Sequence, residues 1–498
     1  MKKLFSLLLL TVLMASTVMA SAAPKAQDRQ KAIDEFVLSQ MELGQIPGLA
    51  LGIMEDGSIT CLKGYGTLDG SGAPVTPDTP FEVGSVGKSL TALCIRQLAN
   101  QGKIDYEAPV QTYIPWFTLA DKETAAQIRI VDLIYHRSGL STSAGGMAWS
   151  YNNKYTIEQA VRIMRYVMPD RPAGTTEEYC NLNFIILGLV VEKVSGMSYS
   201  DYLQKHVFEP LQMKNSYPSR AEAENAILAQ GHYVAYGIAL PNYEPVPTAQ
   251  VPAGFQYLSA RDLTAYAALF LNNGYKDGRS IIPDNELPEL SPPFPAPSYA
   301  DRRYNAYWGI ESGKVPGNGY HGHAGASSGY TSVLLINNVE RRAIVVLLNC
   351  RNVSAIPEIT AQNIGNQIAS ILNTGKVPSP QRITHPGLSR SLLLLAAALL
   401  LPLIRLVWAS HFLKSLNRGG GRRRLAVISF ALIDVLLPLM ILIGLPIYFD
   451  NTWPYFLAAG LETSLPPLTA AVLLASTGLI KVLLMIKRGR NLSPTCSA

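Results

Sequence analysis

The chain has 498 residues, of which 48% are hydrophobic and 16% charged, so it is long enough for a large core and more than one domain. Its formal net charge is +6, but from Leu388 onward eleven Lys and Arg face only three acidic residues, and the remainder of the chain is slightly acidic. The basic balance therefore belongs to one end of the chain, which gives no support to binding of nucleic acid.

The N-terminus has the pattern of a secretory signal peptide, which we assign to residues 1–22. Two lysines precede an apolar run over 4–14, and Ala20-Ser21-Ala22 supplies the small residues of a cleavage site. The chain after this segment is then expected on the outer side of a membrane. Its five cysteines lack a CxxC motif, which argues against a disulfide framework or a structural zinc site, although a single pair such as Cys61 with Cys350 remains open.

The first part of the exported chain is predicted to form a helix and a β-hairpin. Apolar residues recur at helical spacing over 28–44, and strands follow at 48–54 and 58–66. Asp56-Gly57 between the strands supplies the positive φ of a tight hairpin turn. A helix over 86–98 is apolar or small on nearly every side, which predicts burial between two layers.

The middle of the chain, over 106–256, is predicted to be mainly helix and loop. Helices are expected at 131–134, 156–168, 183–195 and 199–207. Ser259 and Asp262 form a capping box for a helix over 263–271, in which each side chain bonds the other residue's backbone amide. The proline-rich stretch 283–297 is predicted to be loop.

Strand character returns near the end of the soluble part, and a helix over 361–372 closes it. The expected strands are 306–311, 321–326, 331–336 and 342–349. Sheet-forming segments at the two ends must pair with each other, which leaves the middle as a helical subdomain. The predicted fold class is therefore α+β, an antiparallel sheet flanked by helices plus a mostly helical subdomain, within a domain over 23–373.

A linker over 374–390 precedes three apolar runs, which predict a segment of three transmembrane helices over 391–486. The runs are 391–410, 425–449 and 465–486, each near the ~20 residues that cross a bilayer. Five positive charges lie in 414–424 and more in the tail 487–498, whereas 450–464 has none. The positive-inside rule then places 411–424 and the tail in the cytoplasm and the large domain outside.

One acidic residue, Asp434, lies inside the second apolar run, and Arg405 and Lys481 lie toward the cytoplasmic ends of the other two. Acids within a membrane usually have a partner. We therefore predict that Asp434 pairs with Arg405 or Lys481, the alternative being a lone protonated acid.

The first candidate for chemistry is the pair Ser85 and Lys88. A serine three residues before a lysine places both side chains on one face of a helix. A lysine in a partly dry cleft loses its charge more easily and then helps to take the serine's proton. The alternative for so short a motif is a solvated helix start.

Two further motifs carry candidate groups. Tyr179 and Asn181, in a loop before a helix, offer a phenol for proton transfer and an amide for a substrate's peptide group, the alternative being a turn with an Asn cap. On a strand, His321 and His323 face the same way. Three interpretations are open. The histidines could be a metal-binding pair, although no third ligand is suitably spaced, or they could simply face solvent at the end of a strand. Alternatively, His323 lines a substrate cleft in which Gly325 lets the substrate's backbone lie close.

Together these motifs resemble the serine penicillin-recognising family, which includes class C β-lactamases, DD-peptidases, esterases and D-aminopeptidases. The family's set of Ser-x-x-Lys, Ser-Asp-Asn and Lys-Thr-Gly is matched here by 85–88, by the Tyr-x-Asn form at 179–181 and by a His-x-Gly form at 323–325. Other segments that resemble family landmarks follow in order, at 46–50, 81–88, 102–105, 133–140, 183–196, 259–263 and 323–330.

The resemblance covers about residues 28–372 and implies a β-lactamase/DD-peptidase-like fold. It implies that Ser85 is the acylated nucleophile, with Lys88 as its base and Tyr179 as the proton relay toward the leaving group. Asn181, His323 and Gly325 would bind substrate, and the backbone N–H groups of Ser85 and Ala326 would form the oxyanion hole. His136, in the 133–140 landmark, is taken as structural.

His323 stands where lactamases usually have lysine, facing the substrate's carboxylate. A histidine near its ordinary pKa is only partly charged at neutral pH. A tight hold on the carboxylate of a β-lactam is therefore not expected, and peptidase, aminopeptidase and esterase activities rank above β-lactamase activity.

The function expected from the sequence is that of a membrane-tethered, extracytoplasmic serine hydrolase with no cofactor and no metal. Its substrates are small peptides, amides or esters, with cell-wall peptides as candidates. The alternatives are a β-lactamase, a non-enzymatic penicillin-binding sensor, and a transport or assembly factor with a degenerate outer domain. The short cytoplasmic segments count against the sensor, and the complete Ser-Lys-Tyr-Asn set counts against degeneracy.

Overall fold

The computed structural model of the chain describes residues 26–70, 72–147, 155–223, 225–235, 238–243, 248–282, 320–327, 329–352, 360–377, 386–416, 420–445 and 461–490. Several predictions lie wholly or mainly outside the described residues, namely the signal peptide 1–22, the loop 283–297, the strand 306–311, the segment 450–464 and most of the tail 487–498.

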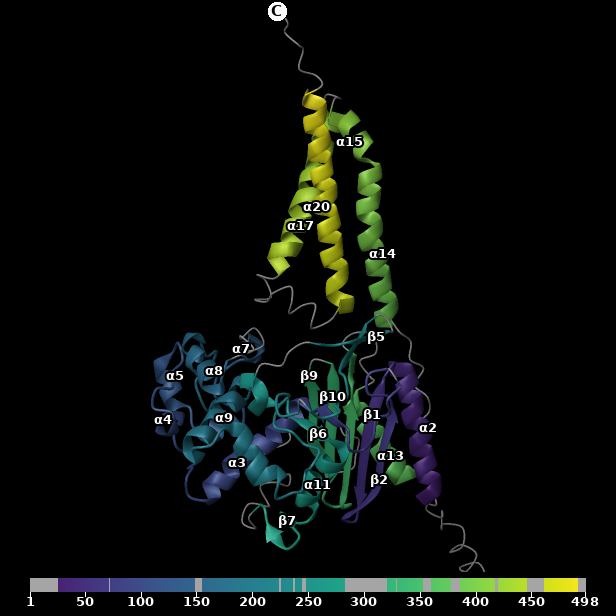
Figure 1. Ribbon diagram of the computed structural model, residues 1–498. Coiled ribbons are helices and arrows are strands. Elements are labelled where there is room, and N and C mark those ends of the chain that lie inside the picture. The colour runs from purple at the N-terminus through teal and green to yellow at the C-terminus, as the bar shows by residue number, and fades with distance from the viewer. Residues whose placement is uncertain are drawn as a thin grey trace, which may run out of the picture.

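A five-stranded antiparallel sheet forms the centre of the large domain, in the order β2-β1-β11-β10-β9 (Figure 1). Its strands are β1 (Gly48–Glu55), β2 (Ser58–Gly66), β9 (His321–Ser327), β10 (Tyr330–Asn337) and β11 (Arg342–Leu348). Strands from the two ends of the domain meet where Leu49 of β1 pairs with Leu348 of β11. The predicted pairing of the two ends, and with it the α+β fold class, is confirmed.

Helices cover both faces of this sheet, because alternate residues of the central strands are apolar on each face. Helices α2 (Ala26–Gly44) and α13 (Ala361–Thr374) pack on one face in a cluster with Leu49 and Leu335. Helix α11 (Ala260–Leu271) packs on the other face. This second face joins the helical subdomain and so borders the candidate site.

The helical subdomain is built around α3 (Lys88–Asn100) and α9 (Asn181–Ser195), which pack together with most of their residues buried (Figure 1). Its smaller helices are α4 (Val110–Tyr113), α5 (Lys122–Gln127), α6 (Ile130–Ile134), α7 (Thr142–Met147), α8 (Ile157–Ile163) and α10 (Tyr199–Leu203). The predicted burial of the helix after Ser85 is confirmed. Its start differs from the prediction, because a 3-10 turn, η1 (Gly84–Gly87), precedes α3.

The structure also contains short strands that the sequence did not predict, because a strand of two to four residues is too short to show a periodic pattern. They are β3 (Pro80–Glu82), β4 (His232–Ala235), β5 (Ile238–Pro241), β6 (Tyr257–Ser259), β7 (Tyr275–Lys276), β8 (Arg279–Ser280) and β12 (Cys350–Asn352). The pair β3 and β6 matters most, because β3 leads directly into the Ser85 turn.

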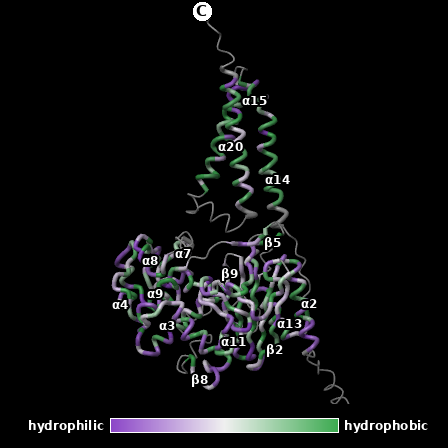
Figure 2. The backbone as a smooth tube through the Cα atoms, viewed as in Figure 1, coloured by the Kyte–Doolittle hydropathy of each residue, from purple (hydrophilic) through white to green (hydrophobic). Residues whose placement is uncertain are grey.

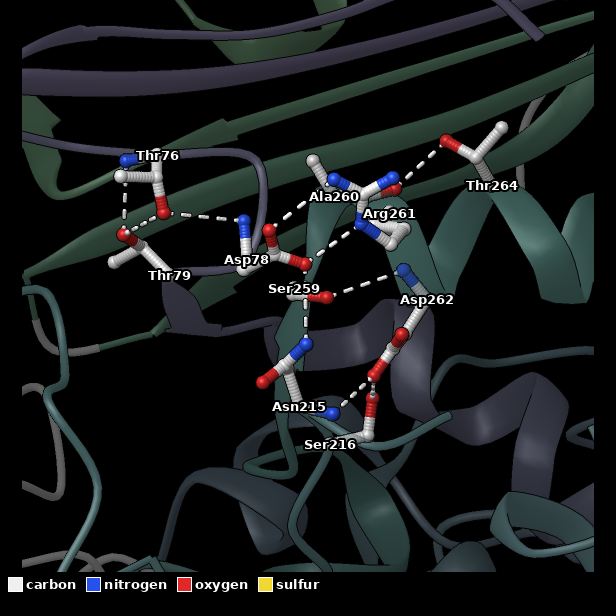
Figure 3. Close-up of polar contacts among 10 residues, drawn as sticks. All are labelled: Thr76, Asp78, Thr79, Asn215, Ser216, Ser259, Ala260, Arg261, Asp262 and Thr264. Carbon is white, nitrogen blue, oxygen red and sulfur yellow. Dashed lines mark hydrogen bonds and ion pairs between the residues drawn. The ribbon is translucent and has the colours of Figure 1, made fainter. Parts of the chain in front are cut away.

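The predicted capping box of α11 is half correct (Figure 3). The Ser259 hydroxyl accepts from the Asp262 amide at 3.1 Å, as expected. The Asp262 carboxylate, however, accepts hydrogen bonds from the backbone N–H of Asn215 at 2.7 Å and from the hydroxyl of Ser216 at 2.8 Å. The carboxylate therefore ties α11 to a distant loop, which local sequence spacing does not reveal.

The cysteines of the described chain are all free thiols. Cys61, Cys94, Cys180 and Cys350 are buried and unpaired, so the Cys61–Cys350 bond left open by the sequence is not formed.

Beyond the large domain, hydrophobic helices run together away from the sheet (Figures 1 and 2). They are α14 (Pro386–Val407), α15 (Ala409–Leu416), a helix over Gly421–Gly444 that contains α16 (Gly421–Ser429) and α17 (Leu437–Leu439), and α20 (Leu461–Arg490). Helix α14 thus begins within the segment predicted as linker.

Among the described residues, two helices are long and apolar enough to cross a membrane, Gly421–Gly444 and Ser464–Lys487. Two bent pairs pass only if each is taken as one span: Leu392–Val407 with Ala409–Leu416, and Asn181–Ser195 with Tyr199–Phe208. The second pair belongs to the buried core of the helical subdomain, which explains its apolar composition. The first pair corresponds to the first predicted apolar run.

Asp434 joins these C-terminal helices through two cations at once. Its carboxylate accepts from Arg405 Nε at 3.2 Å and from Lys481 Nζ at 2.7 Å, and Thr477 adds a hydroxyl bond at 3.3 Å. Asp434 is buried, as is Lys481. The prediction of a partner for Asp434 is confirmed, and both candidates take part.

We expect Asp434→Asn to destabilise the C-terminal helices by about 3–5 kcal/mol, because it leaves two largely buried cations without their counter-charge. The measurement is unfolding of the full chain in detergent micelles, followed by circular dichroism as sodium dodecyl sulfate is added. Thr477→Val, which removes only one neutral bond, is the matched control and should cost about 1 kcal/mol. Equal stability of Asp434→Asn and the parent protein would show that the ion pairs do not hold these helices together.

Candidate active site

Ser85 lies in the 3-10 turn η1, which packs against strand β9. Gly84 makes this approach possible, because its φ is +52° and a Cβ there would lie 2.7 Å from the Ala326 nitrogen. In a 3-10 turn, residues three apart are eclipsed. Ser85 and Lys88 therefore project to the same side, as the motif predicted, although by a different local geometry.

Lys88 is buried, with 1% of its surface exposed, and its Nζ contacts the Ser85 hydroxyl at 3.2 Å. Nζ also donates to Asn181 Oδ1 at 2.7 Å and to the backbone oxygen of Ala253. Burial lowers the pKa of Lys88 to about 7. A neutral amine has two N–H groups for Asn181 and Ala253, which leaves its lone pair to accept from Ser85.

Tyr179 is the second partner of the serine, with 2.6 Å between its hydroxyl and Ser85 Oγ. Its ring also lies beneath the Lys88 amine, 4.9 Å from Nζ to the ring centroid. Asn181 is the first residue of α9, and its amide oxygen reaches Lys88. The structure thus brings together the four residues of the first two motifs, with Ser85 bonded from both sides.

The loop over 136–142 holds the Tyr179 segment in place. His136 Nδ1 accepts from the Cys180 amide and from Asn183 Nδ2, both at 3.1 Å. Its ring lies 4.6 Å from that of Tyr179. From the other side, the Thr142 hydroxyl donates to the Tyr179 carbonyl at 2.7 Å.

His136 is neutral, because burial and then the nearby charge of Lys88 hold its pKa well below the usual value. Only a neutral ring leaves Nδ1 free to accept hydrogen bonds. The sequence placed His136 in a structural role, and nothing in its motif revealed that the ring contacts Tyr179.

Strand β9 forms the opposite wall. A Cβ on Gly325 would lie 2.0 Å from the Val83 carbonyl oxygen and 2.4 Å from Ser332 Oγ, so glycine is required for β9 to pack on the chain before Ser85. The sequence attributed this glycine to a substrate's approach, but its immediate neighbour is the protein's own backbone. Ala326, at the end of the strand, is exposed beside the turn.

His323 is buried and neutral, which corrects the expectation of partial charge. Its pKa is lowered to about 3, mainly by burial and then by the charge of Lys88. Its Nδ1 lies 2.6 Å from the Ala324 carbonyl oxygen. His321 is buried as well, so the two histidines are not solvated, and the described part of the chain contains no cluster of three or more potential metal ligands.

Comparisons with known proteins bear on the family and the fold of the chain. A family model described as Beta-lactamase matches residues 33–366. Protein flp of Staphylococcus aureus (strain MW2) is 26% identical over 470 residues, covering 92% of this chain and 91% of that protein. This match must include much of the C-terminal helical region.

Two further similarities concern enzymes. Unguisins hydrolase ungD' of Aspergillus campestris is 29% identical over 302 residues, which cover 56% of this chain and 55% of that protein, so the chain spans about half of that relative. The solved structure of D-amino acid amidase from Ochrobactrum anthropi SV3 with L-phenylalanine amide has a TM-score of 0.59 and 22% identity. It covers 70% of this chain and 99% of the amidase, and it shows the shared fold.

Proposed function

We propose that this chain, which belongs to the beta-lactamase family and is a serine hydrolase, cleaves amide or ester bonds of small peptide-like substrates through an acyl-enzyme on Ser85. The observation that carries the proposal is the double contact of the Ser85 hydroxyl, with Lys88 at 3.2 Å and Tyr179 at 2.6 Å. An amine and a phenol at hydrogen-bond distance from one hydroxyl supply both a proton acceptor and a route to the leaving group.

In the first step, Lys88 Nζ takes the proton of Ser85 as Oγ attacks the substrate's carbonyl carbon. The resulting oxyanion is stabilised by the backbone N–H groups of Ser85 and Ala326. Tyr179 then delivers a proton to the leaving nitrogen or oxygen, the C–N or C–O bond breaks, and the proton on Lys88 restores the phenol. Asn181, held by Lys88, binds the substrate's amide.

In the second step, water attacks the acyl carbonyl carbon and gives one proton to the neutral Lys88 amine. The C–O bond to Ser85 then breaks as the Tyr179 phenol protonates Oγ, and Lys88 returns its proton to the phenol. The carboxylic acid leaves, and Ser85 Oγ regains its proton. The lowered pKa of Lys88, about 7, makes both steps feasible near neutral pH because a large share of the amine is then unprotonated.

We further propose that the hydrolase domain is tethered to a membrane by the C-terminal helices and acts outside the cytoplasm. Support comes from the signal-peptide pattern, the apolar helices and the five positive charges between the first two runs. Cell-wall peptides are then a candidate substrate. The similarity to a fungal hydrolase supports hydrolysis rather than a purely penicillin-binding role.

The test is to purify the full chain in detergent and to incubate it with amino-acid amides, short peptides ending in two D-alanines, nitrophenyl esters and a chromogenic cephalosporin. We expect turnover of at least one amide or ester and an acyl adduct on the peptide that contains Ser85, detected by mass spectrometry after acid quench. An adduct on another residue, or turnover without any adduct on Ser85 under rapid quench, would contradict the mechanism.

The His136 contacts lead to a prediction about positioning. We expect His136→Ala to lower kcat for ester hydrolysis by about 10- to 100-fold, because the Tyr179 segment loses its anchor, while KM changes less. His136 has a φ of +54°, a conformation that asparagine tolerates, and the asparagine Oδ1 can replace Nδ1 as an acceptor.

His136→Asn should therefore recover most of kcat. A purely structural role predicts instead that both variants lose folded protein in parallel with activity, with kcat per folded molecule unchanged. Titration of the active sites with an acylating ester separates these outcomes.

A further inference from the structure

A loop over 251–256 packs directly on the turn that carries the nucleophile. It joins the end of a 3-10 helix, η5 (Thr248–Ala253), to strand β6. The backbone N–H of Val83, just before the turn, donates to the last carbonyl of the loop at 3.0 Å. Another carbonyl of the loop accepts from Lys88 Nζ. The position of this loop therefore determines where Lys88 finds one of its hydrogen-bond acceptors.

Three successive carbonyls of the loop each accept a hydrogen bond from a side chain. The carbonyl of Val251 accepts from Gln256 Nε2 at 2.8 Å. The carbonyl of Pro252 accepts from Thr91 Oγ1, on helix α3, at 2.7 Å. The third carbonyl is that of Ala253, which accepts from Lys88. The loop is thus held by side chains at the two residues that precede the Lys88 contact.

Tyr199, at the start of α10, links Thr91 to Gln256. Its hydroxyl lies 2.6 Å from Thr91 Oγ1 and 3.3 Å from Gln256 Nε2, and all three side chains are buried. The Thr91 proton goes to a carbonyl, so the Thr91 oxygen accepts from Tyr199, whose own oxygen accepts from the Gln256 amide. Each proton has one place, and a buried network satisfied in this way is rigid. These three side chains are here called the Thr91 network.

The loop requires such a restraint, because part of its backbone is strained. Phe255 is buried and has a φ of +77°, a conformation that a residue with a side chain keeps only where its surroundings hold it. Gly254 has a φ of +140°, and a Cβ there would lie 2.6 Å from the Gly84 carbonyl oxygen. Without the network, the loop is expected to relax and to carry the Ala253 carbonyl with it.

We propose that the Thr91 network orients the amine that takes the proton of the nucleophilic serine. A neutral Lys88 directs its two N–H groups at Asn181 and Ala253, and these two acceptors fix the direction of its lone pair toward Ser85. The network holds the second acceptor, so its members are positioning residues that act through Lys88. The inference rests on the proposed acyl-enzyme on Ser85 and adds what orients the base.

The test is Thr91→Val, which keeps the shape of the side chain and removes its hydroxyl. The full chain is mixed with a nitrophenyl ester, and acylation of Ser85 is followed by rapid quench. We expect the acylation rate constant per active site to fall at least about 10-fold, with less than about a threefold change in the ester's dissociation constant. Active sites are counted by complete acylation, so unfolded molecules do not contribute.

Two variants serve as rescue and control. Thr91→Ser keeps the hydroxyl and should stay within about threefold of the parent rate constant. Thr264→Val removes another buried hydroxyl, which donates to the Ala260 carbonyl at 2.7 Å within α11, and should leave the rate constant unchanged. If Thr91→Val does not fold, Tyr199→Phe replaces it, because it removes only the hydroxyl that joins the network and should give the same fall.

A second background separates orientation of the base from a general disturbance of the site. In Lys88→Met the network has no amine to orient, so adding Thr91→Val should change the residual acylation rate less than about twofold. A further fall of 10-fold in this background would show that Thr91 does not act through Lys88, and would overturn the inference. A parent-like rate constant in both Thr91→Val and Tyr199→Phe would overturn it as well.

The proposed function is judged by the parent protein alone. If the ester acylates Ser85 and the Thr91 variants match the parent, only the inference about the network fails. If the parent forms no adduct on Ser85, the acyl-enzyme itself fails.

Discussion

Replacing Ser85 by alanine is expected to lower the hydrolysis rate by at least about 1,000-fold and to remove the acyl adduct altogether. The reason is that Oγ of Ser85 is the atom that would form the covalent bond. The residual rate would come from substrate binding and the oxyanion donors alone. The measurements are steady-state hydrolysis of a nitrophenyl ester and intact-mass analysis of the quenched protein.

Ser89, one helical turn further on, provides a matched control. Its side chain is buried, and its hydroxyl donates to the Val86 carbonyl oxygen at 2.8 Å. Ser89→Ala should keep the rate within a few-fold of the parent protein. If Ser85→Ala retained a tenth of the activity, the nucleophile would have to be sought elsewhere.

Much of the fold could be predicted from the sequence, because the main strands have strong local signals. The Asp56-Gly57 turn, with positive φ at both residues, identified the β1–β2 hairpin. The sequence also predicted that strands from the two ends of the domain pair with each other, and in the structure β1 pairs with β11. The short strands and the 3-10 start at Ser85 depend on tertiary contacts with β6 and β9, which no local window contains.

The candidate site, too, could be predicted only in part. The spacing of Ser85 and Lys88 is local, but Tyr179 approaches from 94 residues away, and only the resemblance to a family linked the two motifs. The protonation state of His323 could not be predicted. His323 is neutral because the folded chain buries it near Lys88, and its tautomer depends on one carbonyl contact.

In the C-terminal helices, the ion-pair cluster around Asp434 could also be predicted only in part. Opposite charges in apolar runs indicated a pairing partner for Asp434, since an isolated charge there is costly. Which cation would pair depended on how the helices pack, and the structure uses Arg405 and Lys481 together. The sequence therefore predicted that Asp434 forms an ion pair, but the geometry of the pairing depends on how the helices pack.

The second large effect is expected at Lys88. Lys88→Met should lower kcat/KM by about 100- to 10,000-fold, because it removes the base while leaving a side chain of similar length in the buried site. Lys88→Arg should be impaired to a similar degree, since a guanidinium stays charged and cannot take the serine's proton. Lys31→Met, at an exposed lysine of α2, is the matched control and should retain full activity.

The pH dependence separates a base from a merely structural cation. The pKa of Lys88 is lowered to about 7 by burial, so the active unprotonated form increases as pH rises through about 7. We expect kcat/KM of the parent protein to fall about tenfold per unit below that value and to level off above it. The residual activity of Lys88→Met should lack this step. A parent profile that is flat between about pH 5 and 9 would mean that Lys88 does not take the proton, whereas a step that persists in Lys88→Met would assign the titration to another group.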